Sequence, residues 1–171
     1  MSVTIPEMTL PEEYEYGFSY EYGVDININD VWQRIRFISN VAPTLDAVTQ
    51  DAQTYEDKGS PNAPKVGESW SLAFFVQKIV TPTGVLPEVK ELLSAMSPDA
   101  VGKKASRQFR WYDNPASGRV PIESEAFSGI GTVNMTRAQT GADGAIDGWN
   151  VTITGQGRRL QIANPANTPA P

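Results

Sequence analysis

Two glutamates, Glu123 and Glu125, have the spacing at which acidic side chains could do chemistry. Residues 120–127 have the composition of a β-strand, and side chains two apart on a strand share one face. A carboxylate pair on one face is the arrangement that glycosidases use. The sequence places no sugar-binding aromatic residues beside this pair, so a solvated or interface face is the better interpretation. A hydrolase stays an alternative, which would require a glycosidase activity that Glu125→Gln abolishes.

Metal and cofactor chemistry has few candidates, because the sequence contains no Cys and no His. The usual ligands of structural zinc, iron–sulfur clusters and haem are therefore missing, and so are nucleophile–imidazole pairs. Residues 25–30 carry several side-chain oxygens, but the glycine and distal glutamate of a calcium-binding loop are absent. The glycine-rich stretch 140–148 lies between predicted strands, which does not favour phosphate binding. We predict no catalytic residue, no cofactor, no metal and no enzymatic activity.

Basic residues gather at two places in the sequence. Nucleic acid would be one partner for them, but the formal net charge of −6 argues against tight binding to phosphates. We instead predict contacts between subunits, with acidic segments of a neighbouring copy as partners. The candidates are Lys103, Lys104, Arg107, Arg158 and Arg159.

The acidic excess lies at one end of the chain. Residues 1–33 hold seven acidic residues and no Lys or Arg, whereas residues 34–171 hold 14 basic and 13 acidic residues. This acidic segment is also rich in aromatic residues, unlike a solvated acidic tail. We expect it to be ordered.

Strands are the elements that must position these residues. From residue 14 to 28, aromatic and β-branched residues alternate without a break with acidic or small ones, which predicts one bent strand or two collinear strands. Residues 29–30 favour a turn, and 31–41 read as a second strand that completes a hairpin. Residues 68–80 predict a further strand with Trp70, Leu72, Phe74 and Val76 on one face.

Two segments between these strands differ from them. Residues 42–67 contain proline, glycine and acidic residues with little periodicity, and they predict a long loop of a kind that is commonly functional. Residues 86–97 predict the one helix, since Val89, Leu92, Leu93 and Met96 recur at helical spacing after Pro87.

The remaining chain predicts a mainly β protein. Strands are expected at 105–112, 120–127, 131–137 and 149–155, and residues 164–171 predict a flexible tail. The fold class is therefore a β-sandwich or partial barrel with one flanking α-helix, in a single domain over residues 1–163. We expect no signal peptide, because the N-terminal residues have no basic start and no long apolar run, and no membrane anchor, because the longest apolar run is residues 72–76.

Several stretches, in order and spacing, together resemble the major tail tube proteins of siphophages, the bacteriophages with long non-contractile tails, particularly those that infect actinobacteria. The resemblance spans most of the chain. The stretches that carry it are YGVDIN (22–27), WQRIRFISNVAP (32–43), TYEDKGSPNAPKVGESWSLAF (54–74), LPEVKELL (86–93), RWYDNP (110–115) and TGQGRRLQIANP (154–165).

This resemblance implies a subunit that assembles as a hexameric ring, in which inward strands of six copies close a shared β-barrel. Stacked rings then form the tail tube, through which the genome is ejected into the host cell. The implied partners are further copies of the chain, the tape measure protein, tail terminator and baseplate proteins, and phage DNA that passes without specific binding. The implied location is the virion, and the host cytoplasm during assembly.

The resemblance also assigns roles to residues. The long loop, 42–67, would contact the adjacent ring, and its candidates are Asp46, Asp51, Tyr55, Glu56, Asp57, Lys58 and Lys65. The family tends to have an acidic lumen, which suits DNA transit because a cationic wall would bind phosphates. The acidic residues that we expect to line this lumen are Glu15, Glu21, Asp25, Glu123 and Glu125.

Sheet edges give an independent reason to expect assembly, since unpaired strands offer free backbone groups to a second copy. Two alternatives stay open besides the hydrolase. One is a related tube-like part, such as a tail terminator, a baseplate protein or the tube of a contractile or secretion system. The other is a carbohydrate-binding β-sandwich, suggested by four tryptophans, Trp32, Trp70, Trp111 and Trp149, and by the tyrosines at residues 14–22.

Overall fold

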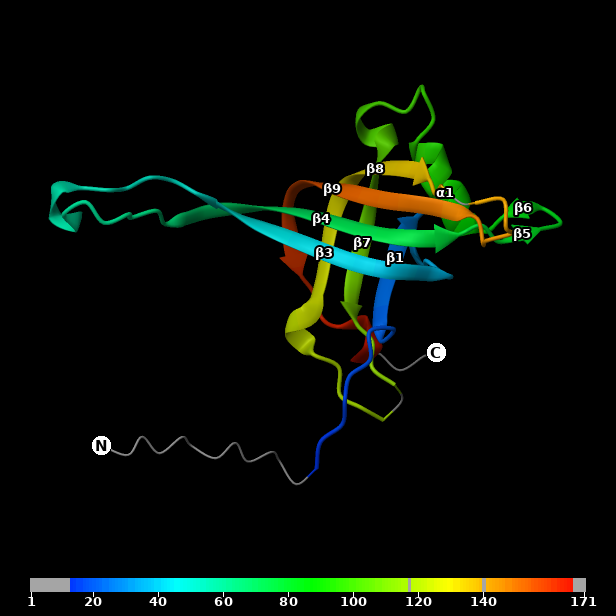
Figure 1. Ribbon diagram of the computed structural model, residues 1–171, viewed down its shortest axis with the longest axis horizontal. Coiled ribbons are helices and arrows are strands. Elements are labelled where there is room, and N and C mark those ends of the chain that lie inside the picture. The colour runs from blue at the N-terminus through cyan, green and yellow to red at the C-terminus, as the bar shows by residue number, and fades with distance from the viewer. Residues whose placement is uncertain (1–12, 117, 140, 168–171) are drawn as a thin grey trace.

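The computed structural model describes residues 13–116, 118–139 and 141–167. Its main element is a seven-stranded antiparallel sheet with the strand order β2-β1-β7-β8-β9-β4-β3, beside which a two-stranded ribbon and one helix lie (Figure 1). The bounds are β1 Tyr22–Ile28, β2 Val31–Arg34, β3 Ile38–Thr49, β4 Lys65–Gln77, β5 Val80–Thr81, β6 Gly84–Val85, α1 Pro87–Ala95, β7 Ser106–Asp113, β8 Ala126–Arg137 and β9 Gly148–Gln161. Short 3₁₀ turns span Tyr55–Asp57, Gly102–Ala105, Glu123–Glu125 and Pro165–Asn167. The predicted fold class, mainly β with one flanking helix, is confirmed.

The large sheet folds over on itself and forms two layers. One layer holds β2, β1 and β7, and the other holds β9, β4 and β3; the long strand β8 joins them, since its first part pairs with β7 and nearly its whole length pairs with β9 (Figure 1). The fold-over coincides with glycines. A Cβ on Gly129 or Gly155 would stand 2.4 or 2.5 Å from the Trp70 ring, so only glycine lets this indole pack between the strands.

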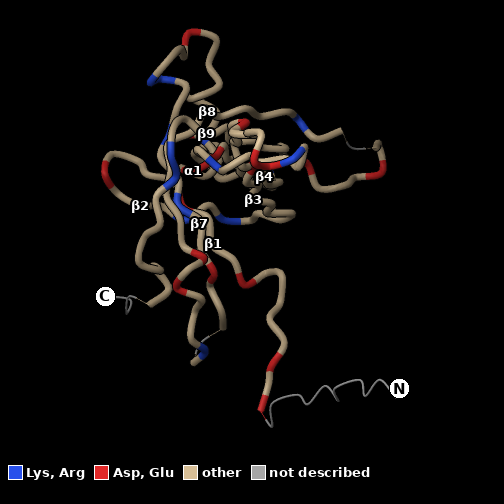
Figure 2. Tube along the Cα trace, turned by 90° about the vertical axis from the view of Figure 1, so that its left-hand side faces the viewer, with Lys and Arg blue, Asp and Glu red and all other residues tan. Residues whose placement is uncertain are grey.

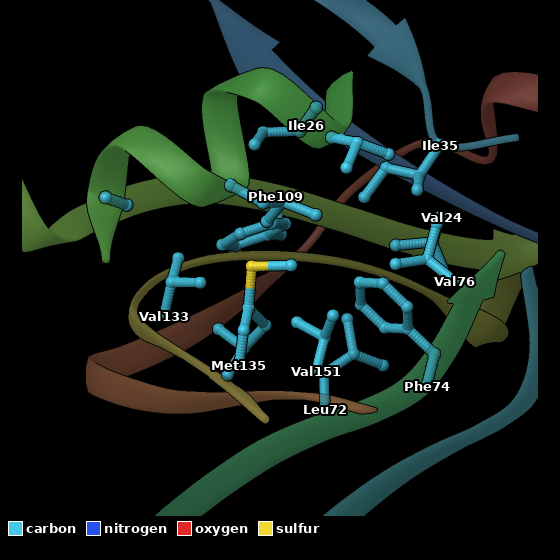
Figure 3. Packing of buried hydrophobic residues seen from close by; sticks show 14 of the residues in the cluster. Val24, Ile26, Ile35, Leu72, Phe74, Val76, Phe109, Val133, Met135 and Val151 are labelled. Carbon is cyan, nitrogen blue, oxygen red and sulfur yellow. The ribbon is translucent and has the colours of Figure 1, made fainter. Parts of the chain in front are cut away.

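The hydrophobic core fills the space between the layers. Figure 3 shows Ile26 and Phe109 from one layer facing Leu72, Phe74 and Val151 from the other. The face predicted for β4 is confirmed, because Trp70, Leu72, Phe74 and Val76 are all buried. Each buried aliphatic or aromatic side chain stabilises the fold by about 1.5–3 kcal/mol.

The helix α1 closes one end of this core. It starts at Pro87, which has the fixed φ of a first helical turn, and its buried residues Val89 and Leu92 join the core cluster. Met96, which the periodicity places on the same face, is the C-cap residue and stays 37% exposed. The helix is therefore where the sequence predicts it.

The first hairpin is also confirmed, with a shorter second strand. Strands β1 and β2 pair from Ile28↔Val31 to Asp25↔Arg34, and Asn29 and Asp30 adopt positive φ values of 51° and 65° between them. The strand predicted over 31–41 is wrong as a single element. The chain leaves the first layer after Arg34, passes the buried Ile35, and enters the second layer as β3.

The strand predicted from residue 14 begins only at Tyr22. Its ladder with β7 ends at Tyr22↔Asp113, and residues 13–21 have no neighbouring strand among the described residues. Alternation alone therefore does not make a strand here, because an extended segment also needs backbone partners. The expectation that this acidic and aromatic segment packs as an ordinary strand is wrong.

The long loop predicted over 42–67 is also wrong in its structure. Strand β3 continues to Thr49 and pairs with β4 through Thr49↔Lys65, so most of the segment is an extended hairpin that projects from the body (Figure 1). We call residues 46–69 the arm and residues 50–64 its tip. Pro43 is tolerated because β3 is an edge strand, where one side of the backbone needs no ladder partner.

Two C-terminal expectations also differ from the structure. The strands predicted over 120–127 and 131–137 are one strand, β8, which starts at Ala126, and Glu123–Glu125 form a 3₁₀ turn before it. The tail predicted to be flexible from residue 164 starts with a buried residue: the Asn164 amide donates hydrogen bonds to the carbonyls of Asp113 and Ile122. Residues 168–171 lie outside the described residues.

Candidate assembly surfaces

Two unpaired strand edges lie on opposite sides of the layer that β8 shares with β9, β4 and β3. Strand β3 pairs with β4 on one side only among the described residues. At the far side, the ladder of β7 with β8 ends at Ser106↔Thr132, so residues 133–137 of β8 pair with β9 alone. Free edges of this kind present backbone donors and acceptors to a further strand.

The arm tip is a built structure rather than a free coil. The Asp57 carboxylate accepts a 2.7 Å hydrogen bond from the Thr54 backbone N–H, and the Ala52 N–H donates to the Asn62 carbonyl at 2.8 Å. The Thr54 hydrogen bond lowers the pKa of Asp57, so the tip keeps its negative charge at neutral pH. Tyr55, at 99% exposure, points away from all of these groups.

The other candidate residues of the arm are spread along it. Asp46 is exposed in β3, and the Asp51 carboxylate accepts a hydrogen bond from the Gln53 N–H. Lys65 donates to Glu68 at 2.9 Å at the base of the tip. Glu56 and Lys58 flank Asp57 on the exposed turn, where Lys58 adopts a left-handed conformation with φ 50°.

The segment before β1 exposes aromatic side chains. Tyr14, Tyr16, Phe18 and Tyr20 are between 53% and 76% exposed. They contact each other in two pairs, with ring centroids 5.7 Å apart for Tyr14 and Tyr16 and 5.5 Å apart for Phe18 and Tyr20. Acidic and small residues alternate with them, and Figure 2 shows the acidic ones in red along this part of the trace. An apolar surface of this kind, rimmed by charge, is typical of a protein contact.

The acidic residues predicted to line a lumen occur in three settings. Asp25 is 3% exposed and accepts a 2.6 Å hydrogen bond from the Arg110 guanidinium, beside the Tyr112 hydroxyl at 3.3 Å. Glu21 is also buried, and both Glu21 and the exposed Glu15 pair with Arg119. Glu21 and Asp25 are therefore neutralised within their own chain.

Glu123 and Glu125 lie elsewhere, on the 3₁₀ turn before β8. The Glu123 carboxylate accepts hydrogen bonds from the Asn164 N–H, at 2.8 Å, and from the Asn167 amide, so it holds the C-terminal segment. Glu125 is exposed close to Tyr22, whose pKa is raised to about 12, first by burial and then by this carboxylate. The structure does not bring the five acidic residues together in one surface.

Two solved structures share this fold. One is the tail of an empty GTA particle, obtained by helical refinement with C6 symmetry; it matches with a TM-score of 0.62 and 10% identity over 86% of this chain and 100% of that chain. The chain shares the fold of this tail protein. The other is the sheath/tube terminator of an extracellular contractile injection system, PVC, in its extended state, with a TM-score of 0.50 and 12% identity over 88% of this chain and 98% of that chain. No protein-family model and no curated protein sequence matches the chain.

The basic candidates divide into residues that pair with acidic residues of their own chain and residues that are exposed. Arg107 donates to Glu91 at 2.5 Å and to Ser94 at 2.9 Å, so it attaches β7 to α1. Arg159 donates to Glu68 at 2.8 Å and its guanidinium covers the Phe127 ring at 3.9 Å. Lys103, Lys104 and Arg158 are exposed. These three residues keep charges that a neighbouring chain could pair.

The structure gives little support to a catalytic carboxylate pair, a metal site or a membrane-spanning helix. Because Glu123 and Glu125 lie on a turn, the strand geometry that suggested a catalytic pair is wrong. Among the described residues, no group of three or more His, Cys, Asp or Glu side chains could hold a metal ion. In the same part of the chain, no helix is long and apolar enough to cross a membrane.

The aromatic residues that suggested sugar binding occur in several different settings. Trp70 and Trp111 are buried and contact each other in the core, with ring centroids 4.9 Å apart. Trp32 and Trp149 are half-buried, each with an arginine over its ring. The tyrosines before β1, Tyr14, Tyr16 and Tyr20, are exposed. No flat row of tryptophans faces solvent among the described residues.

Proposed function

We propose that the chain is the subunit of a siphophage-type tail tube, which polymerises as stacked hexameric rings and serves as a conduit for DNA during ejection. The observation that carries this proposal is the pair of free edges, β3 and residues 133–137 of β8, on opposite sides of one four-stranded layer. The C6 symmetry of the GTA tail supports six copies in each ring.

The two edges suit a head-to-tail contact. Within the layer β8-β9-β4-β3 every neighbouring pair is antiparallel, so β3 and β8 run in opposite directions. If β3 of one copy lies beside β8 of the next, the joint is antiparallel like the rest of the sheet. A head-to-tail contact that closes by rotation gives a ring, and closure removes both free edges.

The arm and the segment before β1 are the elements that would join one ring to the next. The arm projects beyond the body (Figure 1), with a hydrogen-bonded tip and a fully exposed Tyr55. The aromatic segment is exposed among the described residues. The exposed cations Lys103, Lys104 and Arg158 would pair with acidic residues of a neighbouring copy. Asp46, Asp51, Glu56, Asp57, Lys58 and Lys65 would contact the adjacent ring from the arm.

This role implies a place in the virion as part of its tail, with assembly in the host cytoplasm. The further partners would be a tape measure protein inside the growing tube and terminator or baseplate proteins at its ends. DNA would pass through the tube without specific binding, in keeping with a chain whose net charge is −6.

Negative-stain electron microscopy of the purified chain tests the proposal. Long tubes of constant width, with six-fold symmetry in end views, are the expected result. A chain that stays monomeric at high concentration would contradict the proposal. The second candidate, a tail terminator, is favoured by the likeness to the tube terminator of the injection system. It predicts single rings that do not stack.

A further inference from the structure

The outer face of the layer β8-β9-β4-β3 is made of uncharged side chains, mostly hydroxyls and amides. We propose that this face is the channel wall of the tube, and that double-stranded DNA slides along it without ionic contacts. This inference rests on the proposed tail-tube function and assigns the channel to residues other than the acidic ones expected from the sequence.

The strand register places these side chains in three cross-strand rows. Paired residues on neighbouring strands share a face, so each row crosses all four strands. The rows, written from β3 to β8, are Thr44, Ser71, Thr154 and Thr132; Ala42, Ala73, Thr152 and Asn134; and Ser39, Phe75, Asn150 and Thr136.

Eight of these twelve side chains are exposed, and the other four, Ser71, Ala73, Phe75 and Thr132, are half-buried. Asn134, Thr152 and Thr154 are exposed, whereas Val133, Met135, Val151 and Ile153 between and beside them belong to the core. The face is therefore a true sheet surface of the isolated chain. None of the three rows contains a charged residue, and the next row toward the arm tip contains one, Asp46, opposite Ser69.

The lack of charge is local to this face. Protein surfaces usually carry about 25–35% charged residues, and this chain has 20% overall. The outer face of the other layer, in contrast, carries charged residues that pair with one another. There, Arg34, Asp25 and Arg110 stand in one row, and the Arg110 guanidinium lies 4.7 Å from the centre of the Trp32 ring.

Ring closure decides which way the uncharged face points. The other face of the layer is covered by β1, β7 and α1, whose side chains meet those of β4 and β9 in the core (Figure 3). When β3 of one copy joins β8 of the next, this cover has room only outside the ring. The uncovered face must then point to the axis.

The chemistry of the face suits a polyanion in transit. Hydroxyl and amide side chains offer no cation that would hold phosphates, so the counterion release that drives nonspecific DNA binding is absent. The wall also carries no dense row of carboxylates whose repulsion would depend on salt within about 8 Å. DNA passage through such a channel should vary little with ionic strength.

Single cysteines test the assignment cleanly, because the chain has none of its own. Thr152→Cys and Asn134→Cys place a thiol on the face, and Lys90→Cys places the control thiol on the exposed side of α1. Assembled tubes of each variant are treated with a small maleimide and, separately, with a maleimide carried on a large folded protein that cannot enter a channel.

The expected result has two parts. In unassembled protein, all three thiols react with both reagents. In tubes, the thiols at positions 134 and 152 react with the protein-borne reagent more than tenfold more slowly than in unassembled protein, but they still react with the small maleimide. Equal reactivity of positions 152 and 90 toward the protein-borne reagent in tubes would overturn the assignment. Protection of position 152 from the small reagent as well would also overturn it, because the face would then be a protein contact. Failure to form tubes at all would instead overturn the proposed function.

Discussion

Glu88 is the fully buried acidic residue on which α1 depends. Its carboxylate accepts two hydrogen bonds from the Arg36 guanidinium, at 2.8 and 3.2 Å, and lies within 3.4 Å of the Arg36 backbone N–H. Burial alone raises the pKa of Glu88, but the hydrogen bonds from Arg36 outweigh it and leave the pKa below its ordinary value. The helix is thus attached to the segment between β2 and β3 through an ionised group.

Arg36→Met should therefore destabilise the chain at neutral pH by about 2–3 kcal/mol, because it leaves a buried carboxylate without its cation. The depressed pKa of Glu88 stabilises the wild type above the unfolded-state value, about 4.3, and this contribution is lost as pH falls through the lower folded-state pKa. The difference in unfolding free energy between variant and wild type should shrink as pH falls from 7 into this range, because the buried carboxylate without its cation takes up a proton first. Urea unfolding at pH 7 and pH 4 measures it, with Arg36→Lys as the milder control. A constant difference at both pH values would contradict this account.

At the scale of single elements, the segment before β1 carries exposed aromatic side chains that we expect to contact a neighbouring copy. Tyr16 and Tyr20 are 74% and 76% exposed and have no role in the core. The double variant Tyr16→Ser, Tyr20→Ser should have a free energy of unfolding within about 0.5 kcal/mol of the wild-type value, as most surface substitutions do. Its assembly into tubes should fail or need a much higher concentration. Sedimentation of assembled material beside urea unfolding of the monomer separates the two effects, and an unchanged critical concentration would refute the contact.

The arm is the second such element. Thr49 and Lys65 are its last paired residues, so Asn-Gly in place of residues 50–64 would close a two-residue hairpin without changing the body. We expect a folded chain that forms rings but does not stack them, since the tip would no longer reach the adjacent ring. Electron microscopy measures the tube length. Tubes as long as those of the wild type would remove the arm from the contact between rings.

The same elements show how far the sequence could predict the structure. Helix α1 and the buried face of β4 follow from periodicity, because one stripe or one face of each packs on a single core. The arm has no such pattern: both of its faces meet solvent, so nothing in the composition of residues 42–67 distinguishes paired strands from a loop. Residues 14–20 fail in the opposite way, since they alternate perfectly but have no strand to pair with in the described part of the chain.

The candidate residues were harder to predict than the elements. Asp25 and Glu21 look like a free acidic face in the sequence, but their arginine partners Arg110 and Arg119 come from positions about 85 to 98 residues away in the chain. The uncharged rows could not be predicted from the sequence either, because they depend on the register of four strands. One signal was available: alternate residues of 150–154 are Asn, Thr and Thr, without a charge.

At the scale of the whole assembly, six copies per ring would repeat any change of the channel wall many times along the tube. Thr152→Lys is the sharpest such change, because Thr152 lies in the middle row of the uncharged face. Each ring would gain six cations directed at the DNA, whose duplex carries one charge per about 1.7 Å.

Tubes of this variant should retain fluorescent duplex DNA at low salt and release it steeply as salt rises, whereas wild-type tubes should retain almost none. Ser97→Lys, which adds the same charge at an exposed position after α1, is the matched control and should behave like the wild type. Equal DNA retention by both lysine variants would show that the sheet face does not contact the passing duplex.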